Sequence, residues 1–461
     1  MNPNLQDSQS INPINKKGKH YRLPVPVRLI ASLGAFIIIG TLLMCFPSVG
    51  SIRPLSLPEA LFTAVSALTC TGLSILTPAV DLSVFGQVLL LILIQLGGIG
   101  YITLAITIFR LLGLKISMVD RITLRDQFGV LRTGAILEFA QQVLLTVLAI
   151  EALGTLLLWL HWRSSMGDLR ALWFAAFHAI SAFCNAGFDL FNGLQAYPEG
   201  IPNDIFTLFV MGSLITLGSM GFPIISNLLH FPKSRKLTLH TRLTLIIILT
   251  LTILGSIMLI TSESILPEGV FHGESLSKSI LLSTYQIIST RTAGFAGFST
   301  FQQISSAGKL ILMVFMFIGS SPASMGGGLK TGALITLLLL FRGFVRGQKT
   351  ISIYGRTISR EQAYRALAVL LASLLVIISM TWFILLTNPT DLETALFEVI
   401  SAFATCGYSM GLTTQLNTAG LILMIITMFW GKLGALTIVS ALTGRQKEIL
   451  VHYPEENILI G

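Results

Sequence analysis

The sequence has 461 residues, of which 53% are hydrophobic and only 11% are charged, and its mean hydropathy is +0.80. Soluble domains average about 25% charged residues, so this composition excludes an ordinary soluble enzyme and predicts a polytopic membrane protein. The formal net charge of +9 does not indicate a nucleic-acid partner, because the basic residues alternate with long apolar segments. Residues 1–23 are polar, and we interpret them as a short cytosolic tail rather than a cleavable signal sequence.

Most of the lysine and arginine residues fall into five clusters, which are Lys16–Arg28, Arg110–Arg132, Lys233–Arg242, Arg342–Arg365 and Arg445–Lys447. Positive residues close to helix ends mark the cytoplasmic side of a membrane protein. If all five clusters are cytoplasmic, an even number of membrane crossings must separate each cluster from the next. We therefore expect a multi-pass protein of the cell membrane with both termini in the cytoplasm.

A short apolar run occurs four times, and each copy contains a glycine close to its end. The four copies are Phe62–Ser74, Phe177–Asp189, Tyr285–Phe295 and Phe397–Ser409. Their glycines, Gly72, Gly187, Gly294 and Gly407, lie roughly 110 residues apart, a period too long for a solenoid repeat. Duplicated membrane units of this size are known from transporters.

Each repeat predicts two membrane spans separated by a helix too short to cross, since a span needs roughly 20 apolar residues. For the first unit, 24–113, we expect an outer span, a short helix, a return loop and a second span at Val27–Pro47, Leu57–Thr69, Cys70–Ser74 and Asp81–Gly113. For the second unit, 114–230, the same four elements are expected at Ala135–His161, Leu169–Cys184, Asn185–Phe188 and Asp204–Leu229.

The last two units follow the same order. For the third unit, 231–345, we expect the elements at Leu239–Ser262, Lys278–Thr290, Arg291–Phe295 and Ser306–Phe341. For the fourth unit, 346–445, we expect them at Glu361–Thr387, Thr390–Thr405, Cys406–Tyr408 and Asn417–Thr443, with 446–461 as a C-terminal tail. The predicted fold is therefore an all-α membrane protein of four outer helix–pore loop–inner helix units around one pseudo-fourfold pore.

The four loops predict a selectivity filter for a cation. Irregular backbone at membrane depth is tolerated only where it is buried in protein or lines a water-filled path, and carbonyl oxygens there can replace the hydration shell of a cation. Glycine permits a positive φ, and the negative C-terminal ends of the short helices favour a cation. The alternative is that each glycine only allows close helix packing. The predicted ion-binding residues are Cys70, Thr71, Gly72, Asn185, Ala186, Gly187, Thr292, Ala293, Gly294, Thr405, Cys406 and Gly407.

The segment Gly319–Gly328, GSSPASMGGG, interrupts the third inner span with helix-breaking residues. It predicts a flexible loop below the filter, although a kink that neighbouring helices tolerate is the alternative. Milder breaks occur at similar depth in the other inner spans, at Gln95–Gly100, Leu217–Pro223 and Trp430–Ala435.

Three basic residues, Arg291, Lys330 and Lys432, fall at predicted membrane depth, where a charge indicates a functional site by default. For Arg291 we expect either a purely structural role or a brace behind the filter, with Glu398 or Asp189 as its partner. The four cysteines, Cys45, Cys70, Cys184 and Cys406, have no CxxC spacing, and we interpret them as buried thiols without chemistry.

From about Pro24 onward the chain resembles the membrane subunits of the Trk/Ktr/HKT superfamily, which keep one filter glycine in each of four loops. The lack of an extra N-terminal hairpin and the ending HYPEENILIG at His452–Gly461 resemble the KtrB branch. The resemblance implies a homodimer with one pore per protomer and a cytosolic, nucleotide-binding, KtrA-like regulatory ring. It implies an intramembrane gate at the break in the third unit, and at Lys432 the family usually has arginine. The gate residues are then Gly319, Ser320, Ser321, Ser324, Gly326, Gly327, Gly328, Lys330 and Lys432.

The sequence therefore predicts the ion-conducting subunit of a Ktr-type potassium uptake system, and not an enzyme. It contains no phosphate loop, nucleotide fingerprint or Cys/His metal cluster. No covalent cofactor is expected; K⁺ is the cargo, coupling to Na⁺ is left open, and lipid is the surrounding partner. Two alternatives are a secondary transporter with alternating access, for which Glu151 is a candidate binding carboxylate, and the potassium-binding subunit of a P-type pump.

Overall fold

The computed structural model describes residues 25–46, 50–100, 136–197, 200–298, 301–348 and 351–434. The N-terminal tail, the basic cluster Arg110–Arg132, the outer part of the cluster Lys16–Arg28 and the C-terminal motif lie outside these residues. The ends of the predicted spans Asp81–Gly113 and Asn417–Thr443 also lie outside them, as does the expected orientation of the termini.

The first two units are helical where they are described, and their short helices have the expected positions. In the first unit the helices are α1 (Val25–Cys45), α2 (Leu57–Thr69), α3 (Pro78–Asp81), α4 (Val84–Gln95) and the π-helix η1 (Leu96–Gly100). In the second unit they are α7 (Ile136–Met166), α8 (Asp168–Phe183), α9 (Ile205–Met220) and α10 (Phe222–Ser234).

The segment expected as a span at Asp204–Leu229 is divided, at its predicted break Leu217–Pro223, into the helices α9 and α10, and the chain bends by 105° between them. Gly221, between them, has a φ of +87°, a conformation that glycine adopts without steric cost. Pro223 follows in the first turn of α10, where a missing N–H is tolerated. The chain therefore turns sharply at this point instead of continuing as one straight helix.

The third and fourth units repeat the arrangement. The third contains α11 (Leu239–Ile265), α12 (Leu276–Thr290), η2 (Phe301–Gln303), α13 (Ser306–Phe317) and α14 (Thr331–Val345). The fourth contains α15 (Arg360–Thr387), α16 (Leu392–Ala404), η3 (Thr413–Gln415) and α17 (Thr418–Leu433).

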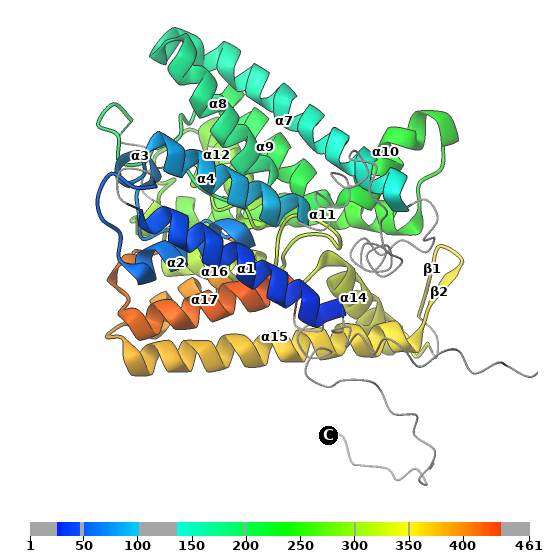
Figure 1. Cartoon of the computed structure of the whole chain (residues 1–461). Helices are drawn as coiled ribbons and strands as arrows, with labels where there is room; N and C mark the ends of the chain where they lie inside the picture. The colour runs from blue at the N-terminus through cyan, green and yellow to red at the C-terminus, as the bar shows by residue number, and fades with distance from the viewer. Residues whose placement is uncertain are drawn as a thin grey trace, which may run out of the picture.

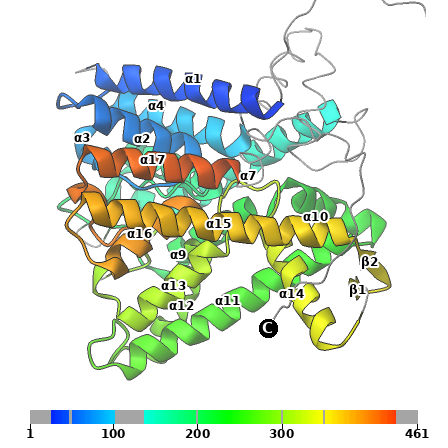
Figure 2. The same cartoon turned by 90° about the horizontal axis from the view of Figure 1, so that it is seen from below.

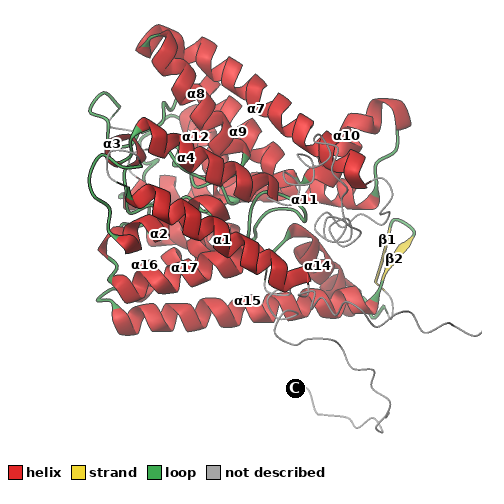
Figure 3. Ribbon diagram, in the orientation of Figure 1, coloured by secondary structure: helices red, strands yellow, loops and turns green. Residues whose placement is uncertain are grey.

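The fold is mainly helical, but the all-α prediction misses one β-hairpin (Figure 3). Strand β1 (Ile351–Ile353) pairs antiparallel with β2 (Arg356–Ile358). The two residues between them, Tyr354 and Gly355, both have positive φ angles. This backbone is the one that a two-residue type I′ turn requires, so the hairpin depends on a turn that the apolar pattern does not reveal.

The units pack in a cyclic order. Each long helix α1, α7, α11 or α15 contacts the short helix that follows it in its own unit. Each inner helix contacts the short helix of the next unit: α4 packs on α8, α9 on α12, and α13 on α16. Helix α17 of the last unit packs on α2 of the first (Figure 2), so the chain closes into a ring of units with the short helices inside.

Three described helices, α7, α11 and α15, are long and apolar enough to cross a membrane, and the bent pair α9–α10 would be a fourth. The other predicted spans are represented, among the described residues, by shorter apolar helices. In the third unit the loop Gly319–Gly328 separates α13 from α14. The hairpin, α10 and the start of α15 lie at one end of the bundle, and α3 lies at the other (Figure 1). The described basic clusters Lys233–Arg242 and Arg342–Arg365 belong to the hairpin end, as expected if that end is cytoplasmic.

Candidate functional site

The loops that follow the four short helices share one backbone pattern. Their glycines Gly72, Gly187, Gly294 and Gly407 have φ angles of +85°, +70°, +74° and +91°. The residue two positions earlier is also left-handed in every loop: Cys70, Asn185, Thr292 and Thr405 have φ angles between 51° and 78°. A non-glycine residue in this region costs about 1–2 kcal/mol, and the sequence gives no signal for it, because the four residue types differ. The four loops therefore have the same backbone geometry. The glycines in it were predicted from the sequence, and the left-handed residues two positions before them were not.

The four loops touch one another in a closed ring. A Cβ atom added to Gly72 would lie 2.5 Å from the carbonyl oxygen of Ala186, and one added to Gly187 would lie 2.6 Å from that of Ala293. In the same way Gly294 faces the carbonyl of Cys406, and Gly407 faces the carbonyl of Thr71. Each glycine thus packs against the carbonyl that precedes the glycine of the next loop. Close helix packing does not account for this arrangement, since the contacts run from loop to loop.

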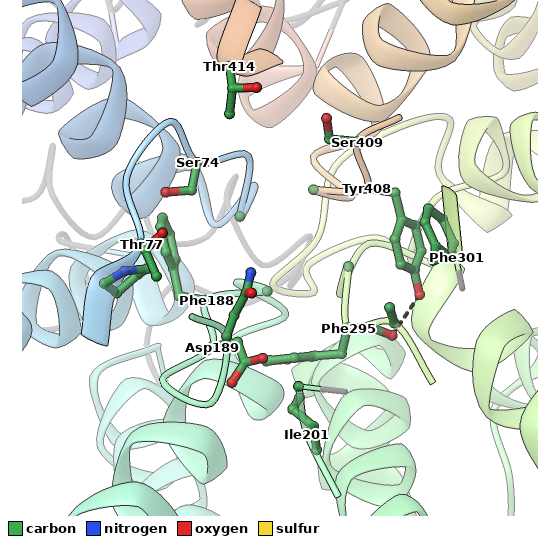
Figure 4. A pocket seen from close by; sticks show the side chains of 18 of the residues that line it. Ser74, Thr77, Phe188, Asp189, Ile201, Phe295, Phe301, Tyr408, Ser409 and Thr414 are labelled. Carbon is green, nitrogen blue, oxygen red and sulfur yellow. Dashed lines mark hydrogen bonds between the residues drawn. The ribbon is translucent and has the colours of Figure 1, made fainter. Parts of the chain in front are cut away.

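A cavity of about 450 Å³ opens on one side of this ring, and all four glycines line it (Figure 4). The other predicted filter residues do not line this cavity; they are buried, with exposed fractions of 0% for Cys70, Thr71, Asn185, Ala186, Thr292, Ala293, Thr405 and Cys406. Neighbouring loops are also joined by side chains: the Asn185 amide and the Thr292 hydroxyl lie 3.0 Å apart. The structure therefore brings all twelve predicted residues to one place.

The segment between α13 and α14 is a loop held by hydrogen bonds, and not a kinked helix. The Gly319 N–H donates to the carbonyl of Leu329 at 3.0 Å, which closes the base of the loop. The N–H groups of Ser321 and Met325 donate to carbonyls at the end of α9. The Gly327 N–H donates to the Thr405 hydroxyl at 2.8 Å, which connects the loop to the ring of glycine loops. Irregular backbone at this depth is satisfied by protein partners, as a lipid environment demands.

Both deep lysines donate hydrogen bonds to this loop. Lys432 Nζ on α17 donates to the Met325 carbonyl at 2.6 Å. Lys330 Nζ donates to the Ser320 hydroxyl at 3.2 Å and to the Gly326 carbonyl. Among the described residues, no carboxylate lies within ion-pair distance of either lysine. Their charges therefore face backbone and hydroxyl oxygens.

The prediction that Glu398 or Asp189 is the partner of Arg291 is wrong. Arg291 follows α12 and is 1% exposed, and its Nε and Nη2 atoms have no partner among the described residues. Asp189 is bonded to His178, with Nε2 and Oδ1 2.9 Å apart. Glu398 accepts hydrogen bonds from its own loop instead. Each carboxylate thus has its hydrogen-bond partners within its own unit, which was not predicted from the sequence.

The Glu398 carboxylate accepts hydrogen bonds from the chain segment that follows the fourth glycine. Its Oε1 accepts from the N–H groups of Met410 at 2.9 Å and Leu412 at 3.2 Å and from the Ser409 hydroxyl at 2.6 Å. Its Oε2 accepts from the Thr413 hydroxyl at 2.7 Å. This role was not predicted from the sequence, although an acidic residue within an apolar short helix is a signal for it.

Glu398→Ala is expected to destabilise the folded protein. The change leaves the backbone N–H groups of Met410, which is partly buried, and Leu412, which is buried, without this acceptor; a buried group left without a partner costs about 1–3 kcal/mol. The midpoint of thermal unfolding in detergent should fall clearly below that of the wild type. Glu361→Ala is the matched control, because Glu361 is exposed and bonds only Arg365 on the next turn of α15 among the described residues. Equal midpoints for the two variants would contradict the structural role of Glu398.

Glu151, the candidate carboxylate for alternating access, does not line the cavity beside the ring. It is 4% exposed and accepts from Gln95 Nε2 at 2.5 Å. The Cys184 thiol donates to Gln95 Oε1 at 2.9 Å. The carboxylate is therefore enclosed in a small polar cluster behind the second loop.

Comparison with known proteins gives a consistent result. The family model described as TrkH, a cation transport protein, matches residues 27–447. The potassium/sodium uptake protein NtpJ of Enterococcus hirae is 33% identical over 460 residues, covering 97% of this chain and 100% of that protein. The Ktr system potassium uptake protein B of Bacillus subtilis is 31% identical, covering 94% of this chain and 96% of that protein. The crystal structure of the potassium transporter TrkH from Vibrio parahaemolyticus superposes with a TM-score of 0.70 at 18% identity, covering 92% of this chain and 86% of that one.

Proposed function

This chain belongs to the TrkH family of cation transport proteins, and we propose that it is the ion-conducting subunit of a Ktr-type potassium uptake system. The predicted resemblance to this family, including its Ktr members, is confirmed. The protein is a membrane transporter for potassium or a related cation, and the steps below are our proposal for how it works.

The closed ring of glycine–carbonyl contacts supports a selectivity filter. An ion enters the cavity beside the ring, loses water, and is coordinated by backbone carbonyls of the four loops. The glycines leave no side chain between the loops, so the carbonyls approach each other closely. No residue does covalent chemistry; the membrane potential drives uptake, at about 2.3 kcal/mol per charge per 100 mV.

The bonded loop between α13 and α14 is the proposed gate. It contacts two of the four glycine loops, since an added Cβ on Gly326 or Gly327 would meet Thr292 or Thr405. Lys432 holds it from α17 through the Met325 carbonyl. A positive charge at this point repels an arriving cation, and the hydrogen bond keeps the loop in the path. Opening then requires Lys432 to release the loop.

The assembly is also a proposal. A Ktr-type system would combine two copies of this chain with a cytosolic, nucleotide-binding, KtrA-like ring. The basic end formed by α10, the hairpin and the start of α15 is the face on which such a ring would dock. Two copies in the cell membrane, with cytoplasmic termini, would place both of these faces on the same side.

Growth of a potassium-uptake-deficient bacterial cell tests the function. Expression of this chain with a Ktr regulatory subunit is expected to restore growth at low external K⁺, and the comparison with and without Na⁺ measures sodium dependence. Co-purification of a large ATPase would instead favour a pump subunit. Failure to restore growth by membrane-inserted protein, under all these conditions, would overturn the proposal.

A further inference from the structure

The cavity beside the ring contains one charged side chain among the described residues that line it, Asp189. Asp189 follows Gly187 by two positions and is drawn in Figure 4 at the wall of the cavity. The remaining lining residues are small, aliphatic, aromatic or neutral polar residues. In a concave site with protein walls, one charge has a larger effect on local ion concentration than it has on an open surface.

The two carboxylate oxygens of Asp189 are in different environments. Oδ1 accepts from the Phe191 N–H at 2.6 Å and lies 2.9 Å from His178 Nε2. Oδ2 has no hydrogen bond from the described residues, and a Cβ added to Gly200, which also lines the cavity, would still lie 3.6 Å from it. The carboxylate is thus fixed by one oxygen while the other is free to bind a ligand.

His178 makes the charge of this site dependent on a proton. It is fully buried on α8, and its Nδ1 lies 2.7 Å from the Phe174 carbonyl, which can only accept. Nδ1 must therefore carry a hydrogen, so that Nε2 of a neutral ring presents a lone pair to Asp189. The short Nε2–Oδ1 contact then requires one shared proton, on the ring or on the carboxylate.

A backbone N–H group is placed to bond the imidazole nitrogen after the shared proton has left. The Leu190 N–H points at His178 Nε2 at 3.3 Å, so it can donate to the ring when the proton leaves. Trp162, Phe191 and Phe295 surround the imidazole with aromatic rings. Tyr285 on α12 is a further titratable group close enough to Asp189 for an electrostatic interaction. The pair therefore has a net charge of zero with the proton and −1 without it.

We propose that Asp189 Oδ2 forms an outer monovalent-cation site in this cavity, and that a proton shared by His178 and Asp189 competes with the cation. The site recruits the ion before it loses water at the ring of glycine loops. Asp189 contacts the ion, and His178 is a positioning residue that sets the charge of the carboxylate. The inference rests on the proposed transport function and adds to it a proton-sensitive entry step.

Uptake kinetics with K⁺ as the probe test this proposal. Asp189→Asn is expected to raise KM for K⁺ by about tenfold, the lower range of electrostatic concentration effects, with maximal uptake and K⁺ preference over Na⁺ unchanged. In the wild type, KM should fall as external pH rises, because loss of the shared proton leaves the pair with a charge of −1, and Asp189→Asn should remove this dependence. His178→Gln, whose amide can donate to Asp189 without titrating, should give a low KM at all pH values.

The control is Glu268→Gln, which removes an exposed carboxylate between α11 and α12 that does not line the cavity. It should behave as the wild type in both KM and pH dependence. A wild-type KM that does not change with external pH, or a folded Asp189→Asn protein with wild-type KM, would overturn the inference. A wild type that takes up no K⁺ would instead overturn the proposed function. If Asp189→Asn does not fold, the comparison between the pH-dependent KM expected of the wild type and the pH-independent KM expected of His178→Gln decides the matter.

Discussion

Gly294→Ser is expected to reduce both K⁺ uptake and the preference for K⁺ over Na⁺ by about tenfold or more. At a φ of +74° a side chain strains the backbone by about 1–2 kcal/mol. A tenfold loss of preference corresponds to a change of about 1.4 kcal/mol in the difference between the K⁺ and Na⁺ barriers. The added Cβ would also collide with the carbonyl of Cys406 in the fourth loop. The carbonyl must move, and the spacing of the ring changes. Tracer uptake with competing Na⁺ measures both effects.

Gly72→Ser should have the same effect from the other side of the ring, because its Cβ would meet the Ala186 carbonyl. Gly273→Ser is the matched control. Gly273 has a similar φ of +79°, but an added Cβ meets nothing within 4 Å. It therefore tests backbone strain without contact between loops. Wild-type selectivity in well-folded Gly72→Ser and Gly294→Ser proteins would count against the filter.

Lys432→Gln is expected to raise maximal K⁺ uptake by about fivefold, which corresponds to a barrier lowered by about 1 kcal/mol. The glutamine keeps a hydrogen-bond donor but removes the charge that repels a passing cation. It is also shorter, which weakens the contact with the Met325 carbonyl. Selectivity should not change, because the altered residue bonds the gate loop and does not belong to the ring of glycine loops. Uptake rate per folded protein is the measurement.

Lys432→Arg should be close to neutral, since arginine keeps the charge and its donors. The competing explanation is a buried ion pair, in which glutamine would leave a carboxylate unpaired and destabilise the protein. Among the described residues Lys432 donates to a carbonyl and not to a carboxylate, so we expect normal folding. A glutamine variant that folds normally but transports no faster would remove Lys432 from the gate.

The sequence alone determined the helical membrane character, the bounds of the short helices and the positions of the four glycines. Helix α2 begins and ends at the predicted residues, and α8, α12 and α16 agree within two residues. It also indicated the break at Gly319–Gly328. These features depend on local signals, namely the length of an apolar run and the presence of glycine or proline, which act on the chain wherever it lies in space.

The tertiary structure decided how these elements meet. The cyclic order of glycine–carbonyl contacts joins loops more than a hundred residues apart, and the left-handed residues such as Asn185 and Thr292 are held there by neighbours in other units. The break at Leu217–Pro223 was predicted, but the size of the bend there, 105°, and the partners of Glu398 and Asp189 were not predictable. The hydrogen bonds of a buried polar group depend on which acceptors the packing brings within about 3 Å, and no local pattern in the chain contains that information.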